Sequence, residues 1–260
     1  MESSWRLIIF VSVFFIMWSW EKYNPLRPIE QVKSYRRTVN LTLAVFTMLL
    51  MRLSFGASSI LLAQEAQLQG MGLLNYFQVL SVGQGLISII MLDLAIYWQH
   101  RLFHQWAGLW RLHEVHHSDL DFDVTTALRF HPLEIVLSMG YKLALILILG
   151  ISPLAVLVFE IGLNASALFN HSNIRLPVAL ERVVRLILVT PAMHRIHHSI
   201  LPTEQATNFG FCLSCWDRLF GTYQATAQGD QTTMLIGVAR YRTPAQVNFV
   251  KCLLMPFTKR

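Results

Sequence analysis

Apolar stretches of about membrane-spanning length are the strongest constraint on how this chain can fold. They occupy residues 5–20, 38–63, 73–98, 133–149 and 153–169. A helix needs about 20 apolar residues to cross a hydrocarbon core of about 30 Å, and its backbone must satisfy its own hydrogen bonds there. Only 14% of the 260 residues are charged, whereas soluble domains carry about 25%. These features predict an all-α, polytopic membrane helical bundle.

The basic residues predict how this bundle is oriented. Five Lys and Arg residues lie between positions 22 and 37, whereas residues 64–72 contain none. Short cytoplasmic loops are enriched in Lys and Arg, so we expect residues 21–37 to face the cytoplasm. The last two apolar stretches form a hairpin, which leaves the chain from His171 onward on that same side. We therefore interpret the net charge of +6 as the result of basic residues that set the orientation and face the lipid headgroups.

All ten histidines lie between positions 100 and 198, and eight of them fall in three clusters whose members are mostly three or four residues apart. Residues with that spacing share one face of a helix, so each cluster can direct two or three imidazoles at one point. Every cluster falls at an expected cytoplasmic helix end or in a cytoplasmic segment. The clusters therefore predict a metal site just beneath the membrane surface. The ten residues are His100, His104, His113, His116, His117, His131, His171, His194, His197 and His198.

The segment 113–117, "HEVHH", has two interpretations. As H-E-x-x-H it is a zinc-protease helix, with His113 and His117 as ligands and Glu114 as the general base. As H-x-x-H-H it is one part of a larger histidine cage. The later "HRIHH" repeats the spacing but has Arg195 at the position of Glu114. Ligands should recur in a two-metal cage, whereas a general base need not, so the cage is favoured and the zinc protease is the alternative.

The number of histidines exceeds what one ion needs. Catalytic zinc takes three protein ligands, whereas this many imidazoles match two adjacent ions that each keep an open position. Imidazole binds iron, copper, nickel and zinc alike, so the ligand type alone does not select the metal. Two redox-active ions could activate dioxygen, and a site in a membrane implies an apolar substrate. A non-catalytic metal-binding or transport membrane protein is a further alternative, although transporter ligands are expected at mid-membrane.

The histidine motifs and their flanks resemble the fatty acid hydroxylase and sterol desaturase superfamily. The similar segments are "DLAIYWQHRLFH", "LWRLHEVHHSDLDFDVTTALRFHPLE", "NHSN", and "HRIHHS" followed by "NFGFCLSCWDRLFGTY". The resemblance covers roughly residues 75–225, and "TTALRFHP" and "WDRLFGTY" look closest to the branch that contains alkylglycerol monooxygenase.

This resemblance implies a membrane-bound non-haem di-iron oxygenase that hydroxylates or desaturates a C–H bond of a lipid or sterol-like substrate. It implies molecular oxygen as co-substrate and electrons from a separate ferredoxin or cytochrome. The implied parts are N-terminal transmembrane helices over 1–74, a hydroxylase-like domain over 75–225 and a C-terminal cytoplasmic tail over 226–260. Carried over by position, the ligands of two iron ions are His100, His104, His113, His116, His117, His171, His194, His197 and His198, with His131 a candidate tenth.

Polar residues near the histidines are candidates for orienting the imidazoles. Asp93 lies seven residues before His100, on the same helix face and deeper in the membrane, where an acid is functional by default. We expect it to accept a hydrogen bond from a ligand imidazole; the alternative is an ion pair with Arg52. Asn170 is a second candidate. The aspartates between 119 and 123 either orient imidazoles or form a solvated acidic loop.

The three cysteines give little functional information. Cys212 and Cys215 form one C-x-x-C, and Cys252 stands apart. An odd, sparse set provides no disulfide framework. We therefore expect core thiols here.

Overall fold

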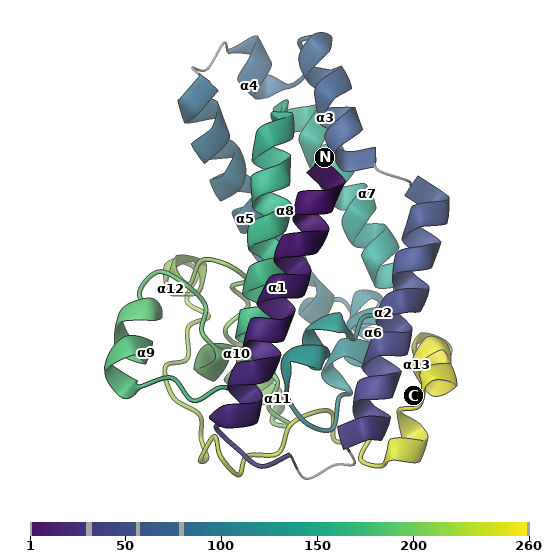
Figure 1. The fold of residues 1–260 in the computed structure, drawn as a ribbon, viewed down its shortest axis with the longest axis vertical. Coiled ribbons are helices and arrows are strands. Elements are labelled where there is room, and N and C mark those ends of the chain that lie inside the picture. Colours follow the sequence, from purple (N-terminus) through teal and green to yellow (C-terminus); the bar gives the residue numbers. More distant parts are fainter. Residues whose placement is uncertain (1, 30–32, 56–57, 78–80, 259–260) are drawn as a thin grey trace.

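The computed structural model describes residues 2–29, 33–55, 58–77 and 81–258 (Figure 1). Over these residues the secondary structure is helical, with three isolated antiparallel bridges and no strand, which confirms the all-α prediction. The elements are α1 (Glu2–Tyr23), α2 (Lys33–Phe55), α3 (Ser58–Leu68), α4 (Leu73–Tyr76), α5 (Ser81–Gln105), α6 (Ala107–His117), η1 (Val124–Leu128), α7 (Pro132–Leu149), α8 (Pro153–Asn170), α9 (Val178–Val184), α10 (Pro191–His197), α11 (Pro202–Gln205), α12 (Cys215–Leu219), η2 (Pro244–Gln246), α13 (Phe249–Leu254) and η3 (Met255–Phe257).

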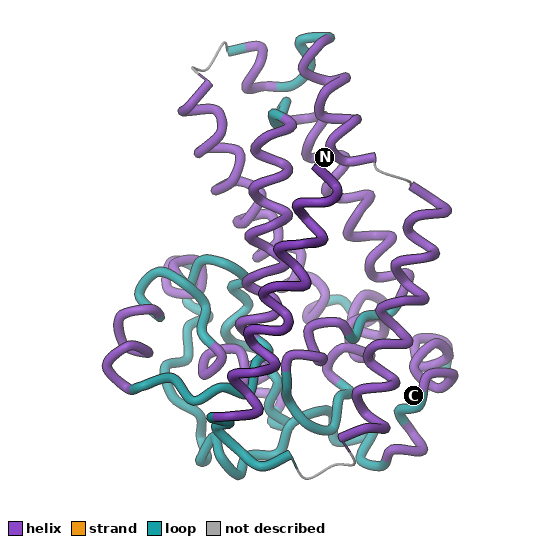
Figure 2. The backbone as a smooth tube through the Cα atoms, viewed as in Figure 1, coloured by secondary structure: helices purple, strands orange, loops and turns teal. Residues whose placement is uncertain are grey.

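The long helices and the loops occupy different ends of the molecule. Figure 2 shows long helices forming the upper part, whereas loops and short helices are gathered in the lower part. We call this lower part the cap; it contains α6, η1, α9–α13 and the loops between them. The cap is the place where the histidine-rich segments come together.

Four segments of the described chain are long and apolar enough to cross a membrane: Lys33–Tyr76, Gly83–Gln105, Pro132–Leu149 and Pro153–Asn170. The first of these contains α2, α3 and α4. The span expected over 38–63 lies within this segment. Residues 56 and 57, between α2 and α3, lie outside the described chain. Helix α3 also continues into the segment that was expected to be an exterior loop.

Helix α1 forms where the first span was expected, but it is not one of those four segments. It packs along α8, and Arg6 near its start is ion-paired with Glu160 in the middle of α8 at 2.7 Å. Glu160 also contacts Lys142 of α7 and accepts a hydrogen bond from Ser59 of α3 at 2.9 Å. One buried carboxylate therefore links four helices.

The hairpin expected over 133–169 is present as α7 and α8. Gly150 ends α7 with a φ of +72°, a conformation that glycine adopts without strain. A side chain at Gly150 would also lie 2.5 Å from the Met71 carbonyl oxygen. Helix α8 then begins with Ser152 as its N-cap and Pro153 in the first turn. The turn residues thus dictate a sharp reversal.

Buried arginines fasten the cap to α2. Arg36 donates to Asp119 at 2.6 Å and is also ion-paired with Asp123. Arg129, which is 1% exposed, donates to Asn40 of α2 at 3.0 Å and to the backbone carbonyl of Val115 at 2.8 Å. The aspartates between 119 and 123 are therefore buried partners of arginines. All three are buried, so the expected solvated loop is wrong. The contacts of Asp119 and Asp123 are with arginines and not with imidazoles.

The segment expected to be a C-terminal tail is part of the cap and packs against α2 and α6. Cys252 and Met255 are buried in one apolar cluster with Leu43 of α2 and Val115 of α6. This packing places the C-terminal helices next to the histidine-bearing helix α6.

We predict that Arg129→Met lowers the free energy of unfolding by about 3 kcal/mol, because it leaves several buried acceptors without a donor. The exposed Arg182 offers a matched control, since Arg182→Met should change stability by less than about 0.5 kcal/mol. Chemical unfolding of the full-length chain in detergent measures both. Equal losses in the two variants would show that Arg129 does not fasten the cap.

Candidate metal centre

Nine of the ten histidines converge in two adjacent groups. Within each group, one nitrogen atom from every residue lies within 4.8 Å of the corresponding atoms of the others. The five-histidine group consists of His100, His104, His113, His117 and His197. The four-histidine group consists of His116, His171, His194 and His198.

Helix α6 supplies both groups. His113 and His117 are four residues apart and belong to the five-histidine group, whereas His116 belongs to the four-histidine group. A helix rotates by about 100° per residue, so His116 and His117 point in different directions. One H-x-x-H-H segment can therefore serve two ions.

Helix α10 and its C-cap also supply both groups, with one histidine for the five-histidine group and two for the four-histidine group. His197 belongs to the five-histidine group, and His194 and His198 belong to the other. The helix begins with Thr190 as its N-cap and Pro191 in its first turn, both of which favour a helix start at this point. These signals fix the rotation of α10 and hence the direction of each imidazole.

The remaining three ligand candidates come from the ends of long helices. His100 and His104 lie on the last turns of α5, and His171 is the C-cap of α8. Both helices carry candidate spans that end at or next to these histidines. The centre therefore lies at one end of the apolar segments.

The two groups touch one another. The rings of His117 and His198, one from each group, stack with centroids 4.3 Å apart and an interplanar angle of 13°. The rings of His113 and His116 also cross the boundary, with centroids 5.2 Å apart. Two ions held here would be neighbours.

Five imidazoles are oriented through Nδ1 by an oxygen acceptor. A carbonyl oxygen or a carboxylate can only accept, so Nδ1 donates and the Nε2 lone pair is left for a metal. The Nδ1 contacts are His100 with the Phe209 carbonyl at 2.8 Å, His113 with Glu134 Oε1 at 2.7 Å, His116 with the Arg129 carbonyl at 3.1 Å, His171 with the Ala167 carbonyl at 2.8 Å and His197 with the Thr207 carbonyl at 2.8 Å.

Several buried nitrogen atoms have no hydrogen-bond partner in the described part of the chain. They are Nε2 of His104, His113 and His197 and both ring nitrogens of His117 and His198. Buried polar atoms are normally paired, so a concentration of unpaired ones calls for a missing partner. A metal ion can be that partner, because imidazole nitrogens coordinate metals through their lone pairs.

Two close contacts within the four-histidine group point to the same conclusion. Nε2 of His116 lies 3.0 Å from Nε2 of His171, and Nε2 of His194 lies 2.9 Å from that same atom. His116 and His171 both donate through Nδ1, so in the neutral rings two lone pairs face each other. Lone pairs at this separation repel unless they share a cation. The donor set therefore fits a metal ion.

Burial keeps the imidazoles neutral, which is the form that coordinates a metal. Burial lowers the pKa of His197 to about 3 and that of His171 to about 4. Burial, and then the neighbouring imidazoles, hold the pKa of His116, His117 and His198 well below the usual range.

Asp93 is buried, but no imidazole is among the partners that the structure describes for it. Its carboxylate accepts from the backbone N–H groups of Cys212 at 3.2 Å and Leu213 at 3.1 Å, and from the indole N–H of Trp216 at 2.8 Å. Arg52 is exposed on α2. Both expected roles of Asp93 are thus replaced by a third, in which it anchors the loop before α12 to α5.

Asn170 and His131 also have structural contacts. Asn170 donates to the Phe211 carbonyl at 2.6 Å, and no hydrogen bond to an imidazole is described for it. His131 lies outside both groups; its Nδ1 accepts from the Leu133 N–H at 3.2 Å as the N-cap of α7, and its Nε2 faces the Leu253 carbonyl at 3.2 Å. The structure brings together nine of the ten predicted histidines and leaves His131 aside.

Glu134 is the site residue that the sequence analysis missed. It is 4% exposed, and its Oε1 accepts the hydrogen bond from His113. Its other oxygen, Oε2, has no hydrogen-bond partner among the described residues. The available signal was an acid in the first turn of an apolar helix, three residues after His131.

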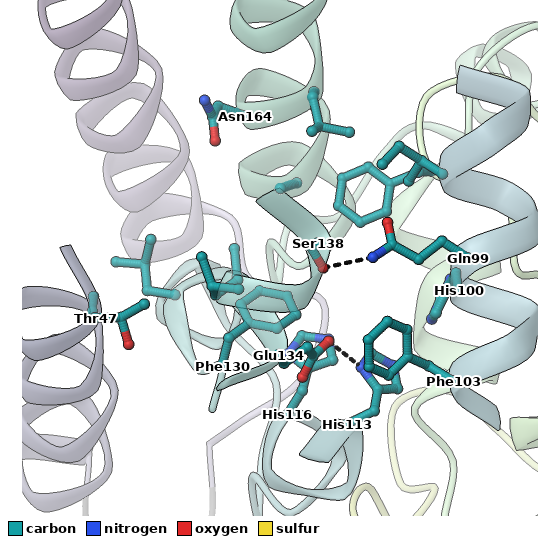
Figure 3. Close-up of a pocket in the computed structure, with 18 of the residues that line it drawn as sticks. Thr47, Gln99, His100, Phe103, His113, His116, Phe130, Glu134, Ser138 and Asn164 are labelled. Carbon is teal, nitrogen blue, oxygen red and sulfur yellow. Dashed lines mark hydrogen bonds and ion pairs between the residues drawn. The ribbon is translucent and has the colours of Figure 1, made fainter. Parts of the chain in front are cut away.

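A cavity of about 350 Å³ leads from the long helices to the histidines (Figure 3). Met48 of α2 lines it and is also 60% exposed, so the cavity opens on the outer surface of an apolar segment. His100 and His113 of one group and His116 and His194 of the other line its inner end. Its apolar walls include Ile96, Phe103, Phe130, Ile135 and Leu163.

A bundle of apolar helices whose cavity ends on two adjacent histidine groups defines a class of membrane protein with a dimetal-type centre. The family model for fatty acid hydroxylase matches residues 85–222, and the chain belongs to that family. Together with its four apolar segments, this identifies the chain as an integral membrane protein.

Several curated proteins are similar to the chain. Ornithine lipid hydroxylase OlsE of Rhizobium tropici is 29% identical over 178 residues, which cover 68% of this chain and 51% of that protein. Human alkylglycerol monooxygenase is 31% identical over 143 residues, covering 53% of this chain and 30% of that protein. The match thus spans about half or less of these relatives. No solved structure matches the chain.

We predict that the two groups lose their ions separately. His198→Ala removes one nitrogen of the four-histidine group and should lower the bound metal from about two ions per chain to about one. His131→Asn should keep both ions, because asparagine also caps a helix. Elemental analysis of the purified variants measures the ratio; loss of the same amount of metal in both would contradict the assignment.

Proposed function

We propose that this protein is a membrane-bound di-iron oxygenase that hydroxylates a C–H bond of a lipid substrate. The observation that carries this proposal is the cavity, which opens at Met48 and ends on imidazoles of both groups. A hydrocarbon chain that enters from the bilayer would reach the two ions together. The relatives named lipid hydroxylase and monooxygenase support the same reaction class.

The proposed metal is iron, with all nine converging histidines as ligands. Imidazole accepts several metals, and the choice of iron follows from the reaction that the family name and the relatives' names describe. When bound, two irons would supply the oxidising power that uses one dioxygen, two external electrons and two protons to convert a C–H bond into an alcohol and form one water. The protein's task is then to position the ligands and the substrate.

The residues around the centre perform that task in separate ways. The carbonyls and Glu134 that receive the Nδ1–H groups fix each ring, and such outer contacts raise the basicity of a ligand. The apolar walls, among them Phe103 and Phe130, exclude bulk water from the end of the cavity. A reactive site shielded in this way protects the oxidant from side reactions.

We also propose that the centre faces the cytoplasm and that the electrons come from a separate ferredoxin or cytochrome. Basic residues in the cap and in residues 22–37 support this orientation. The sequence contains no G-x-G-x-x-G segment for a nucleotide cofactor, so a donor protein is required. The division into parts at residues 74 and 225 likewise stays a prediction.

The two alternatives have less support. A zinc protease needs three protein ligands and a free base, whereas His113 and His117 lie among five histidines and Glu114 belongs to neither group. A transporter should hold its ligands midway along a pathway, but these histidines gather at one end of the apolar helices.

The test uses full-length protein loaded with ferrous iron, a reduced ferredoxin, ¹⁸O₂ and lipids extracted from the host membrane. We expect a lipid to gain one labelled oxygen, and His194→Ala to reduce this by at least about 100-fold. Leu137→Ala, on the outer face of α7, should behave as wild type. If the wild-type protein forms no labelled product, hydroxylation is refuted. A lipid that loses two hydrogens without gaining label would reassign the reaction to desaturation.

Glu134 provides a second prediction. Glu134→Gln keeps an acceptor oxygen for His113 but removes the charge, so metal affinity should fall by about 10-fold. The exposed Glu65 gives a matched control, because Glu65→Gln changes charge far from the centre. Competition with a chelator measures both affinities. Identical affinities for Glu134→Gln and wild type would contradict the orienting role.

A further inference from the structure

Beyond the histidines and Glu134 at its inner end, the cavity is lined by four polar side chains. One of them, Asn164 of α8, donates to the Glu160 carbonyl at 2.8 Å. The other three each come from a different helix. Gln99 of α5 donates its Nε2–H to Ser138 Oγ of α7 at 2.7 Å, above the histidines in Figure 3. Thr47 of α2 lines a third side of the same cavity. We call these three residues the polar collar.

The hydroxyl of Thr47 is buried without a partner. The residue is 7% exposed, and its Oγ1 has no hydrogen bond with any described residue. A helical threonine commonly donates to the carbonyl four residues earlier, and Thr38 on the same helix does so with Ser34 at 2.8 Å. Thr47 does not, so its hydroxyl, which neighbouring atoms cover in this structure, keeps an unused hydrogen-bonding capacity at the wall of the cavity.

The other two members of the polar collar have unused capacity as well. Ser138 accepts from Gln99, which leaves its own hydroxyl hydrogen free to donate. The Oε1 atom of Gln99 has no hydrogen bond with any described residue. The polar collar therefore offers two hydroxyl donors and one carbonyl acceptor.

The collar lies about one helical turn from the centre. Ser138 follows Glu134, the partner of His113, by four residues on α7, which corresponds to about 6 Å along the helix axis. Gln99 immediately precedes His100 on α5. A substrate held by these groups would place an atom only a few bonds away next to the imidazoles.

We infer that the polar collar is a binding subsite for a hydrogen-bonding group of the lipid, an ether, ester, amide or hydroxyl close to the oxidised carbon. This inference rests on the proposed function and specifies its substrate class. A plain hydrocarbon segment would leave Thr47 buried and unsatisfied, which costs free energy. A purely structural bridge between α5 and α7 would account for Gln99 and Ser138 but not for Thr47.

The test compares variants that remove hydrogen-bonding groups and nearly preserve volume: Thr47→Val, Gln99→Met and Ser138→Ala. Thr42→Val is the matched control, because Thr42 is exposed on the same helix. Iron-loaded full-length protein, supplied with a reduced ferredoxin and ¹⁸O₂, is given 1-O-hexadecylglycerol, methyl hexadecanoate, N-hexadecanoylglycine, 1-hexadecanol and hexadecane in separate phosphatidylcholine vesicles. The readouts are KM, kcat, metal content and the position of the added oxygen.

We expect wild type to oxidise at least one of the polar lipids near its oxygen or nitrogen, in preference to hexadecane. Thr47→Val should raise KM for that lipid by roughly fivefold, the factor that one neutral hydrogen bond contributes. It should also spread the added oxygen over more carbon positions while metal content stays unchanged. Thr42→Val should match wild type.

Two results would overturn the inference: KM and oxygen position unchanged in all three collar variants, or hexadecane oxidised as well as the polar lipids. If wild type oxidises none of the five compounds and none of the host lipids, the proposed function itself fails. A variant that loses metal is misfolded, and the remaining collar variants then decide the question.

Discussion

Nine imidazoles gathered together present more ring nitrogens than the described protein groups can satisfy. The protein fixes five rings by accepting their Nδ1–H groups with four backbone carbonyls and one carboxylate. It provides no donors for the inward-facing nitrogens of His117 and His198. Cations would complete such an arrangement, and their binding would then be coupled to folding of the cap.

This requirement explains the polar contacts around the cap. The carbonyls that hold the rings belong to loops, and those loops must be rigid for each ring to keep its direction. Asp93 fastens the loop before α12, and Arg129 ties α6 to α2. Burying these charges in apolar surroundings is tolerated because each is hydrogen-bonded. The same rigidity holds the inner end of the cavity open towards both histidine groups.

The sequence predicted the helical class and the nine converging histidines, because both depend on local patterns. Rotation along α6 directs His113 and His117 to one group and His116 to the other. Which histidines they meet there depends on the tertiary fold, which the sequence pattern does not give. The backbone acceptors at Phe209 and Thr207 leave no trace in residue identity, and therefore the ring-orienting contacts could not be predicted.

The roles of the polar residues near the histidines were the hardest to predict from the sequence. Asp93 and Asn170 lie near ligands in sequence, yet each bonds to a loop that is distant in sequence. His131 has the chemistry of a ligand, but its position before Pro132 makes it a helix cap. Glu134 could be recognised only after the fold had brought it to His113. Long-range contacts, which local patterns do not encode, decide these roles.

X-ray absorption of the iron-loaded full-length protein tests most directly whether the two histidine groups hold a pair of ions. The two groups predict nitrogen-only protein ligation with between four and five imidazoles per iron, together with scattering from a second iron nearby. A spectrum with two or three imidazoles per metal and no metal neighbour would contradict the paired centre.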